Sequence, residues 1–169
     1  HDITMIVMDR PNPNGHYTDG PGVDKKFTSI IGQHQVPVVH GMTVGEYAKM
    51  VNGEGWLKGG IQCNLKVIEM ENYSHQLTYS LPIKPSPNLP NLKSIYLYPS
   101  LCLFEGTIVN EGRGTDKPFQ QFGYPKMPNG NSSYTSLFIK GVAQSPIFKD
   151  QMCNGIDLSV LYEDSLRHM

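Results

Sequence analysis

Residues 3–9, Ile-Thr-Met-Ile-Val-Met-Asp, decide the fold class, because they form a nearly continuous apolar run that ends at a carboxylate. A run of this length predicts a strand covered on both faces, as the strands of parallel sheets are. Asp9 is then expected at the carboxyl end of that strand, where open α/β sheets bind their ligands. Residues 10–15 follow with two prolines and an Asn-Gly pair, which predict a turn.

A helix and a second strand come next. Thr43 is a good N-cap, and Glu46 follows it at the spacing of a capping box. Apolar residues then recur at helical spacing until Gly53, so we expect a helix over residues 44–52. Residues 65–70, Leu-Lys-Val-Ile-Glu-Met, predict the next strand. The order strand, helix, strand favours a parallel sheet and an α/β fold.

The rest of the chain is richer in loops. A proline-rich bend occupies residues 82–91, and the apolar residues 92–104 are compatible with either a helix or a strand. The composition turns to Pro, Asn, Gly and Ser after Gly123, which predicts one domain over residues 1–123 and a second over residues 124–169. Short apolar runs at residues 137–139 and 156–161 predict strands of a small α+β module there.

Composition and charge exclude several functions. The 14 basic and 15 acidic residues give a net charge of -1, which offers no basic field for a nucleic acid and no polybasic stretch for a membrane surface. The longest apolar runs, residues 3–8 and 95–104, are too short to span a bilayer. The three cysteines have no C-x-x-C spacing and the histidines have no metal-ligand spacing, so we predict no metal site and interpret the cysteines as buried apolar residues.

The densest group of polar residues lies within residues 103–119. Glu105 and Glu111 are candidate catalytic carboxylates, because glycoside hydrolysis uses an acid and a second carboxylate. Arg113 could hold a ligand carboxylate with two parallel hydrogen bonds, its two flanking glycines let the backbone approach a ligand, and Thr115 adds a hydroxyl. The alternative is that Arg113 pairs with Glu105 or Glu111 and only fixes the loop.

Two further segments are candidate binding sites. Asp9, Arg10 and Asn12 follow the first predicted strand, and the alternative for them is a salt-bridged turn. Asn88 lies between prolines in a rigid bend and could present its amide to a sugar hydroxyl, or could only cap a turn.

A cysteine hydrolase is a third possible class, with Cys102 as the nucleophile and His40 as its base. The apolar neighbours of Cys102 would raise the pKa of its thiol, and its surroundings resemble no cysteine-hydrolase motif. We therefore place this reading last.

Several long motifs occur here in the order found in one bacterial family. They are VMDRPNPNG (7–15), GPGVD (20–24), VPVVHGMTVGEYAKMVN (36–52), PSPNLPNL (85–92), YPSLCLFEGTIVNEGRGTDKPFQQFGYP (98–125) and CNGIDL (153–158). Through them the chain resembles the exo-β-N-acetylmuramidases, a YbbC-like family formerly catalogued as a domain of unknown function. The match covers nearly the whole chain, although the segment after Met127 departs from the usual pattern.

The resemblance implies a fold and an activity. We expect part of a Rossmann-like sheet followed by a small α+β module, and a parent enzyme that removes terminal N-acetylmuramic acid from peptidoglycan fragments. The family motifs PEHG and FDIQDVG are not found in these residues, so we expect the catalytic acid upstream and this middle portion alone to be inactive. The resemblance also implies muropeptide or disaccharide ligands, no cofactor, and a periplasmic or secreted location. The alternative is a non-catalytic cell-envelope module that binds saccharides or peptides.

Overall fold

The structure is a computed structural model that describes residues 3–166. The chain divides into two compact units, residues 1–79 and residues 80–169. The predicted domain boundary after Gly123 falls inside a strand of the second unit, because the Pro- and Asn-rich residues that follow it form a turn between two strands of one sheet.

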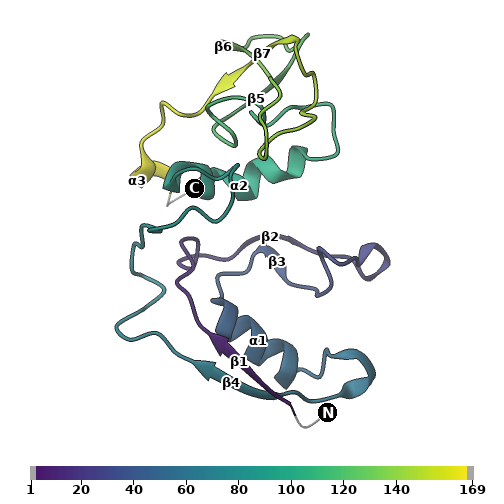
Figure 1. Cartoon of the computed structure of the whole chain (residues 1–169), viewed down its shortest axis with the longest axis vertical. Helices are drawn as coiled ribbons and strands as arrows, with labels where there is room; N and C mark the ends of the chain where they lie inside the picture. Colours follow the sequence, from purple (N-terminus) through teal and green to yellow (C-terminus); the bar gives the residue numbers. More distant parts are fainter. Residues whose placement is uncertain (1–2, 167–169) are drawn as a thin grey trace. The chain divides into compact units, whose positions relative to one another are not determined.

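The first unit is built on two parallel strands. β1 (Thr4–Met8) pairs with β4 (Asn64–Ile68) in the register Thr4 to Asn64. α1 (Val44–Gly53) lies between them in the chain and packs against both strands (Figure 1). The unit also contains an antiparallel pair, β2 (Asp19–Gly22) with β3 (Pro37–Val39), and two short 3-10 turns, η1 (Lys25–Phe27) and η2 (Lys58–Gly60). The predicted strand–helix–strand order and the parallel pairing are confirmed.

The capping box of α1 is present as the sequence predicted. Thr43 accepts a hydrogen bond from the Glu46 backbone N–H through its side chain, and the Glu46 carboxylate accepts one from the Thr43 N–H at 2.8 Å. These bonds satisfy backbone donors that the first turn of a helix leaves without partners. Local sequence alone therefore sets where α1 begins.

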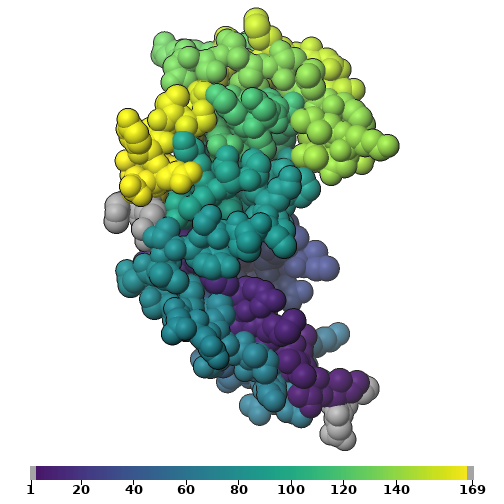
Figure 2. Space-filling view, turned by 60° about the vertical axis from the view of Figure 1, so that its left-hand side comes forward, coloured from purple at the N-terminus to yellow at the C-terminus, as the bar shows by residue number. Residues whose placement is uncertain are grey.

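The prediction that β1 is covered on both faces is wrong for this chain. Met5, Ile6 and Met8 are all more than half exposed, at 58%, 61% and 64%. Among the described residues β1 has one neighbouring strand and one covering helix, so much of its apolar surface meets solvent. In Figure 2 the purple atoms of the first residues lie open on the face in view.

The second unit combines one main helix with an antiparallel sheet. α2 (Leu92–Leu101) continues into η3 (Cys102–Phe104), which settles residues 92–104 as helical. The sheet has the order β5 (Gln121–Tyr124), β7 (Met152–Asp157), β6 (Ser132–Thr135), and the short α3 (Glu163–Leu166) lies against α2 (Figure 1). The predicted α+β character is confirmed, although the strands lie a few residues before the apolar runs that predicted them.

The core of the second unit lies between α2, α3 and the loop before β5. Its buried apolar residues are Tyr96, Leu97, Leu101, Phe119 and Leu166. Phe119 is 1% exposed and has a φ of 54°, a left-handed conformation that is rare for an aromatic residue. The strained backbone at Phe119 is held by this packing and places the ring beneath the polar loop of residues 105–115.

Candidate functional site

The loop of residues 105–115 gathers its charges around one guanidinium. Arg113 donates from Nε to Oε1 of Glu111 at 2.5 Å and from Nη2 to Oε1 of Glu105 at 2.7 Å. The guanidinium carbon also lies 5.0 Å from the centre of the Phe119 ring, a cation–π distance. The structure therefore brings together the arginine and both candidate carboxylates, in the loop-fixing arrangement that was the alternative to ligand contact.

The two ion pairs of Arg113 differ in their surroundings. The Glu111 side chain is 7% exposed, whereas the Glu105 side chain is 42% exposed and that of Arg113 is 34% exposed. Burial lowers the pKa of Arg113, but the hydrogen bonds that it donates to Glu105 and Glu111 outweigh burial and raise its pKa, so the guanidinium is always charged. The ion pair between Arg113 and the buried Glu111 is structural, whereas the ion pair between Arg113 and Glu105 is open to solvent.

Two glycines shape the backbone around Arg113. Gly112 and Gly114 have φ values of 81° and 82°, and a Cβ on Gly112 would lie 2.5 Å from the carbonyl oxygen of Lys117. Other residues are excluded there by both the dihedral angle and the close contact. The glycines therefore serve the turn itself.

Polar side chains beneath the loop are fully engaged. Asn110, which is 0% exposed, donates to the carbonyl oxygens of Arg113 and Ile147 and accepts from the Gly112 N–H at 2.8 Å. The Thr115 hydroxyl donates to Gly112 O at 2.7 Å and accepts from the Lys117 N–H and from the Gln121 amide. The structure shows the Thr115 hydroxyl in hydrogen bonds within the loop, and its expected contact with substrate stays a prediction.

Tyr98 belongs to the same cluster and was not among the candidates from sequence. Its ring lies 4.9 Å from that of Phe119, and the residue is 36% exposed. Burial and the nearby Glu105 carboxylate raise the pKa of its phenol, which keeps the hydroxyl protonated and able to donate. In the sequence, Tyr98 precedes Leu101 and Cys102 by three and four residues, a helical spacing that predicts core packing. Its position beside Glu105 could therefore not be predicted.

Asn88 points into the second unit. It is 8% exposed, and its amide donates to the carbonyl oxygen of Val142 at 3.3 Å. Its side-chain oxygen is buried and has no hydrogen-bond partner among the described residues. Within the part of the chain that the structure describes, the Asn88 side chain thus makes a long-range contact within the second unit and caps no turn, and its predicted contact with a sugar stays a prediction.

Asp9 lies at the carboxyl end of β1, as predicted, and joins β1 to α1. Its carboxylate accepts hydrogen bonds at 2.8 Å from the Thr43 hydroxyl and the Gly45 N–H, and at 2.9 Å from the Arg10 N–H. Burial raises the pKa of Asp9, but these hydrogen bonds together lower it below its usual value. A buried carboxylate with three donors at a helix N-terminus is explained by structure alone.

Arg10 and Asn12 are also engaged locally. The exposed Arg10 donates from Nη1 to the Asp9 carbonyl at 2.8 Å, so it makes no side-chain ion pair with that carboxylate. Asn12 donates its amide to Met42 O and accepts from the Asn14 N–H, which closes the turn. We also expect Asp9, at the carboxyl end of its strand, to face the same cleft as the loop of residues 105–115. Asp9 and Arg113 belong to different units, so this expectation stays a prediction.

A Glu–His pair lies close to Asp9 and was missed at the sequence level. His75 Nε2 lies 2.9 Å from Oε1 of Glu46, and His75 Nδ1 lies 2.9 Å from the carbonyl oxygen of Gly15. Both partners are acceptors, so both ring nitrogens carry protons when both bonds form. The hydrogen bond that His75 donates to Glu46 is the main cause of its raised pKa. The two residues are 29 positions apart, and no local pattern reveals such a contact.

The structure gives no support to a cysteine hydrolase. The Cys102 thiol donates to Pro99 O, and burial followed by the Glu105 charge raises its pKa. His40 accepts from the Met42 N–H through Nδ1, and burial lowers its pKa.

Within residues 3–166 no group of three His, Cys, Asp or Glu side chains could hold a metal ion. In the same residues no helix is long and apolar enough to cross a membrane.

With the folds of both units and the loop geometry established, comparison with known proteins identifies the class. Residues 1–93 match the family described as exo-β-N-acetylmuramidase NamZ, N-terminal, and residues 96–169 match its C-terminal counterpart. The chain therefore belongs to the exo-β-N-acetylmuramidase NamZ family. The family boundary between residues 93 and 96 lies at the first turn of α2.

Individual relatives agree with this family. The peptidoglycan β-N-acetylmuramidase NamZ of Bacillus subtilis (strain 168) is 35% identical over 96% of this chain, which covers 42% of that protein. The crystal structure of a DUF1343 family protein from Bacteroides fragilis NCTC 9343 superposes with a TM-score of 0.94 at 52% identity, over 98% of this chain and 46% of the other. A second such protein of that organism has a TM-score of 0.76 at 24% identity and supports the fold alone. The chain thus spans less than half the length of these relatives.

Proposed function

We propose that the protein carrying this chain is a glycosidase that removes terminal β-linked N-acetylmuramic acid from peptidoglycan fragments. The observation that carries the proposal is the 35% identity, along 96% of the chain, to a protein described as a peptidoglycan β-N-acetylmuramidase. Matches to both halves of the same family support it, because one unit shared with another family would not produce them together.

We infer that this chain supplies substrate-binding surface and that the catalytic residues lie elsewhere in the protein. A general acid has to deliver a proton to the leaving oxygen, whereas Glu105 and Glu111 each accept a hydrogen bond from Arg113. Both carboxylates are thereby occupied as acceptors. The other candidate carboxylate, Asp9, accepts three hydrogen bonds and is equally occupied.

Arg113 is the residue we assign to recognition of the muramic sugar. N-acetylmuramic acid differs from N-acetylglucosamine by a lactyl ether that ends in a carboxylate, and a guanidinium matches a carboxylate best. Two of its five N–H donors are used by the glutamates, the Arg113 side chain is 34% exposed, and that of its partner Glu105 is 42% exposed. Glu105, being exposed, is the partner that a ligand carboxylate would displace.

The setting we propose follows from the substrate. Peptidoglycan fragments arise outside the cytoplasmic membrane, so the protein is expected to act in the periplasm or after secretion. Muropeptides or disaccharides are the expected ligands.

The test is a hydrolysis assay on a chromogenic N-acetylmuramide and on the matching N-acetylglucosaminide. The protein encoded by the complete reading frame is expected to release the chromophore from the muramide and to prefer it over the glucosaminide. Binding of either sugar without turnover would favour the non-catalytic saccharide-binding module, and preference for the glucosaminide would remove the role given to Arg113.

A further inference from the structure

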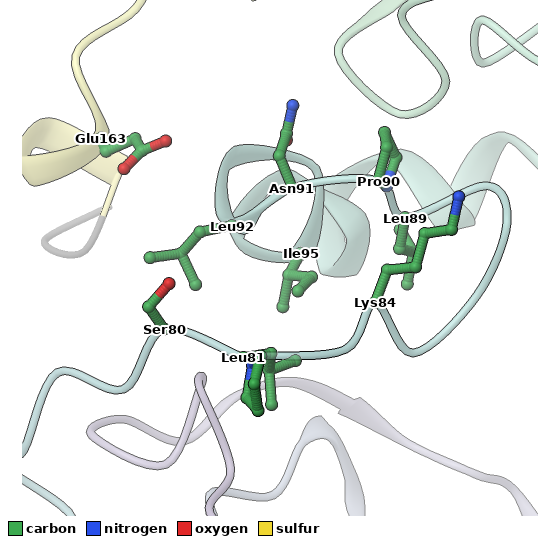
Figure 3. A pocket seen from close by; sticks show the side chains of 10 residues that line it. Ser80, Leu81, Lys84, Leu89, Pro90, Asn91, Leu92, Ile95 and Glu163 are labelled. Atoms are coloured by element: carbon green, nitrogen blue, oxygen red, sulfur yellow. The ribbon is translucent and has the colours of Figure 1, made fainter.

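A pocket of about 550 Å³ lies in the second unit, apart from the loop of Arg113. Figure 3 shows its lining, which comes from the segment before α2, from the first turn of α2 and from the start of α3. The apolar part of the lining includes the aliphatic side chains of Leu81, Leu89, Leu92 and Ile95. Its two charged residues, Lys84 and Glu163, have opposite signs. The volume falls within the range of about 300–1,000 Å³ that is usual for small-ligand sites.

The wall that carries Lys84 is rigid. Four prolines lie among residues 82–90, and Ser86 pairs with Leu89 across a tight turn in which the Leu89 N–H donates to Ser86 O at 3.0 Å. The opposite wall is fixed because Leu166, in the same short helix as Glu163, is part of the core. The backbones that carry the two charges are therefore held in place before any ligand arrives.

Lys84 and Glu163 line one pocket but do not pair. Neither has an ion-pair partner among residues 3–166, although lysines elsewhere in the unit do, such as Lys117 with Asp157 at 2.6 Å. Figure 3 shows the two side chains on opposite sides of the first turn of α2, with aliphatic side chains between them. A ligand that carries one charge of each sign at its ends would satisfy both residues.

We propose that this pocket binds a short free peptide, with its carboxylate at Lys84, its ammonium at Glu163 and an aliphatic side chain on the leucines. The chemistry of the lining argues against other ligands. A sugar usually stacks on aromatic rings, and none of the ten residues that line the pocket is aromatic. A nucleotide would bring more negative charge than one lysine offsets, and a lipid tail would leave both charges without partners. The site is independent of the proposed glycosidase activity.

The test is a titration of the 169-residue chain with alanylleucine, followed by NMR chemical shifts. A ligand of this size is expected to bind with a Kd of about 1 mM. The N-acetylated and C-amidated forms each lack one charge, and each is expected to bind about two- to fivefold more weakly, as for partly exposed ion pairs. The largest shifts are expected for Leu89, Leu92 and Ile95.

Two substitutions assign each end of the peptide. Lys84→Met should remove the preference for the free acid over the amide and keep the preference for the free amine. Glu163→Gln should do the reverse. The matched controls are Lys140→Met and Asp164→Asn, exposed residues that do not line the pocket, and they should preserve both preferences.

Three outcomes would overturn the proposal. They are no binding at peptide concentrations well above the expected Kd, equal binding of the three peptides, or chemical-shift changes at residues outside the pocket. Because the readout is binding to the chain and needs no turnover, failure here leaves the glycosidase proposal standing, and loss of the glycosidase proposal leaves this one standing.

Discussion

Arg113 shows how one residue can be structural and still face a ligand. Its pair with the buried Glu111 fixes the loop, and its pair with the exposed Glu105 is weak, since exposed ion pairs contribute about 0–1 kcal/mol. A ligand carboxylate can replace Glu105 at low cost. The sequence placed all three residues together but could not say which carboxylate was buried.

We predict that Arg113→Lys and Arg113→Ala lower the activity of the full-length protein on a muramide more than on the matching glucosaminide. The loss of a hydrogen bond to a charged group, about 1.5–3 kcal/mol, corresponds to a decrease of roughly 10- to 150-fold in kcat/KM. The measurement is the ratio of the two activities. An unchanged ratio in a folded variant would refute the recognition role, and unfolding of both variants would show that Arg113 serves the loop alone.

Titration of His75 gives a second prediction at this scale. Its pKa in the folded protein is raised above the usual 6.5, so the stability that it contributes is fully present below pH 6.5 and is lost as the pH rises through the raised pKa. The His75 side chain is 40% exposed, so we expect a contribution of only about 0.5–1 kcal/mol. Glu46, the charged partner, and Asp9 and Lys49, which lie nearby, titrate well outside this window.

The measurement is the free energy of unfolding in urea at pH 5.5 and at pH 8.5 for the native chain and for His75→Gln. The difference between the two proteins should shrink as the pH rises. Glu46→Gln, which removes the carboxylate that holds the proton, should show the same reduced pH dependence. A difference that stays constant between the two pH values would contradict the assignment.

At the scale of elements, α1 is anchored through a glycine. A Cβ on Gly45 would lie 2.7 Å from Cγ of Asp9 and 2.7 Å from Cγ1 of Val67, so the helix can approach β1 and β4 this closely only with glycine there. Gly53, in the last turn of the same helix, has nothing within 4 Å of the corresponding position.

The two glycines therefore predict opposite results. Gly45→Ala should destabilise the chain by about 1–3 kcal/mol through the clash, although alanine favours helix formation. Gly53→Ala should be neutral or stabilise by up to about 1 kcal/mol. Urea unfolding of both variants measures this, and an equal effect of the two would show that the Asp9 contact does not restrict the helix.

The sequence predicts a helix or strand well when the interactions that determine it lie between residues close together in the chain. The predicted start of α1 was correct because it depends on Thr43 and Glu46, which interact within one helical turn. α2 has a similar cap, in which Asn91 and Ser94 replace the usual pair, and Pro99 lies inside the helix, so residues 92–104 remained undecided. β6 consists of Ser132–Thr135, polar residues that become a strand only because β7 pairs with them.

At the scale of the whole chain, the parallel sheet is only partly covered. Met5, Ile6 and Met8 of β1 are exposed, and the chain spans less than half of its relatives' length. In most folded proteins, adjacent large apolar side chains on one strand are covered by other parts of the protein or by a partner. We also propose that the reaction chemistry lies beyond these residues, since each carboxylate of the candidate sites already accepts hydrogen bonds.

We therefore predict that a protein of just these 169 residues releases no chromophore from a muramide, while the product of the complete reading frame does. Circular dichroism and the dispersion of NMR signals would establish that the shorter protein is folded. Turnover by the folded short protein would return the catalytic assignment to Glu105 and Glu111, and Glu111→Gln would then be the variant to assay.

The three free cysteines allow the arrangement of the two units to be measured in solution. Cys63 belongs to the first unit and is half-buried, whereas Cys102, also half-buried, and Cys153, which is 0% exposed, belong to the second. Maleimide dyes should react with Cys63 and Cys102 and spare Cys153. A donor and an acceptor on that pair would report, by single-molecule energy transfer, whether the units hold one distance or exchange between several, and whether a muramide narrows the distribution.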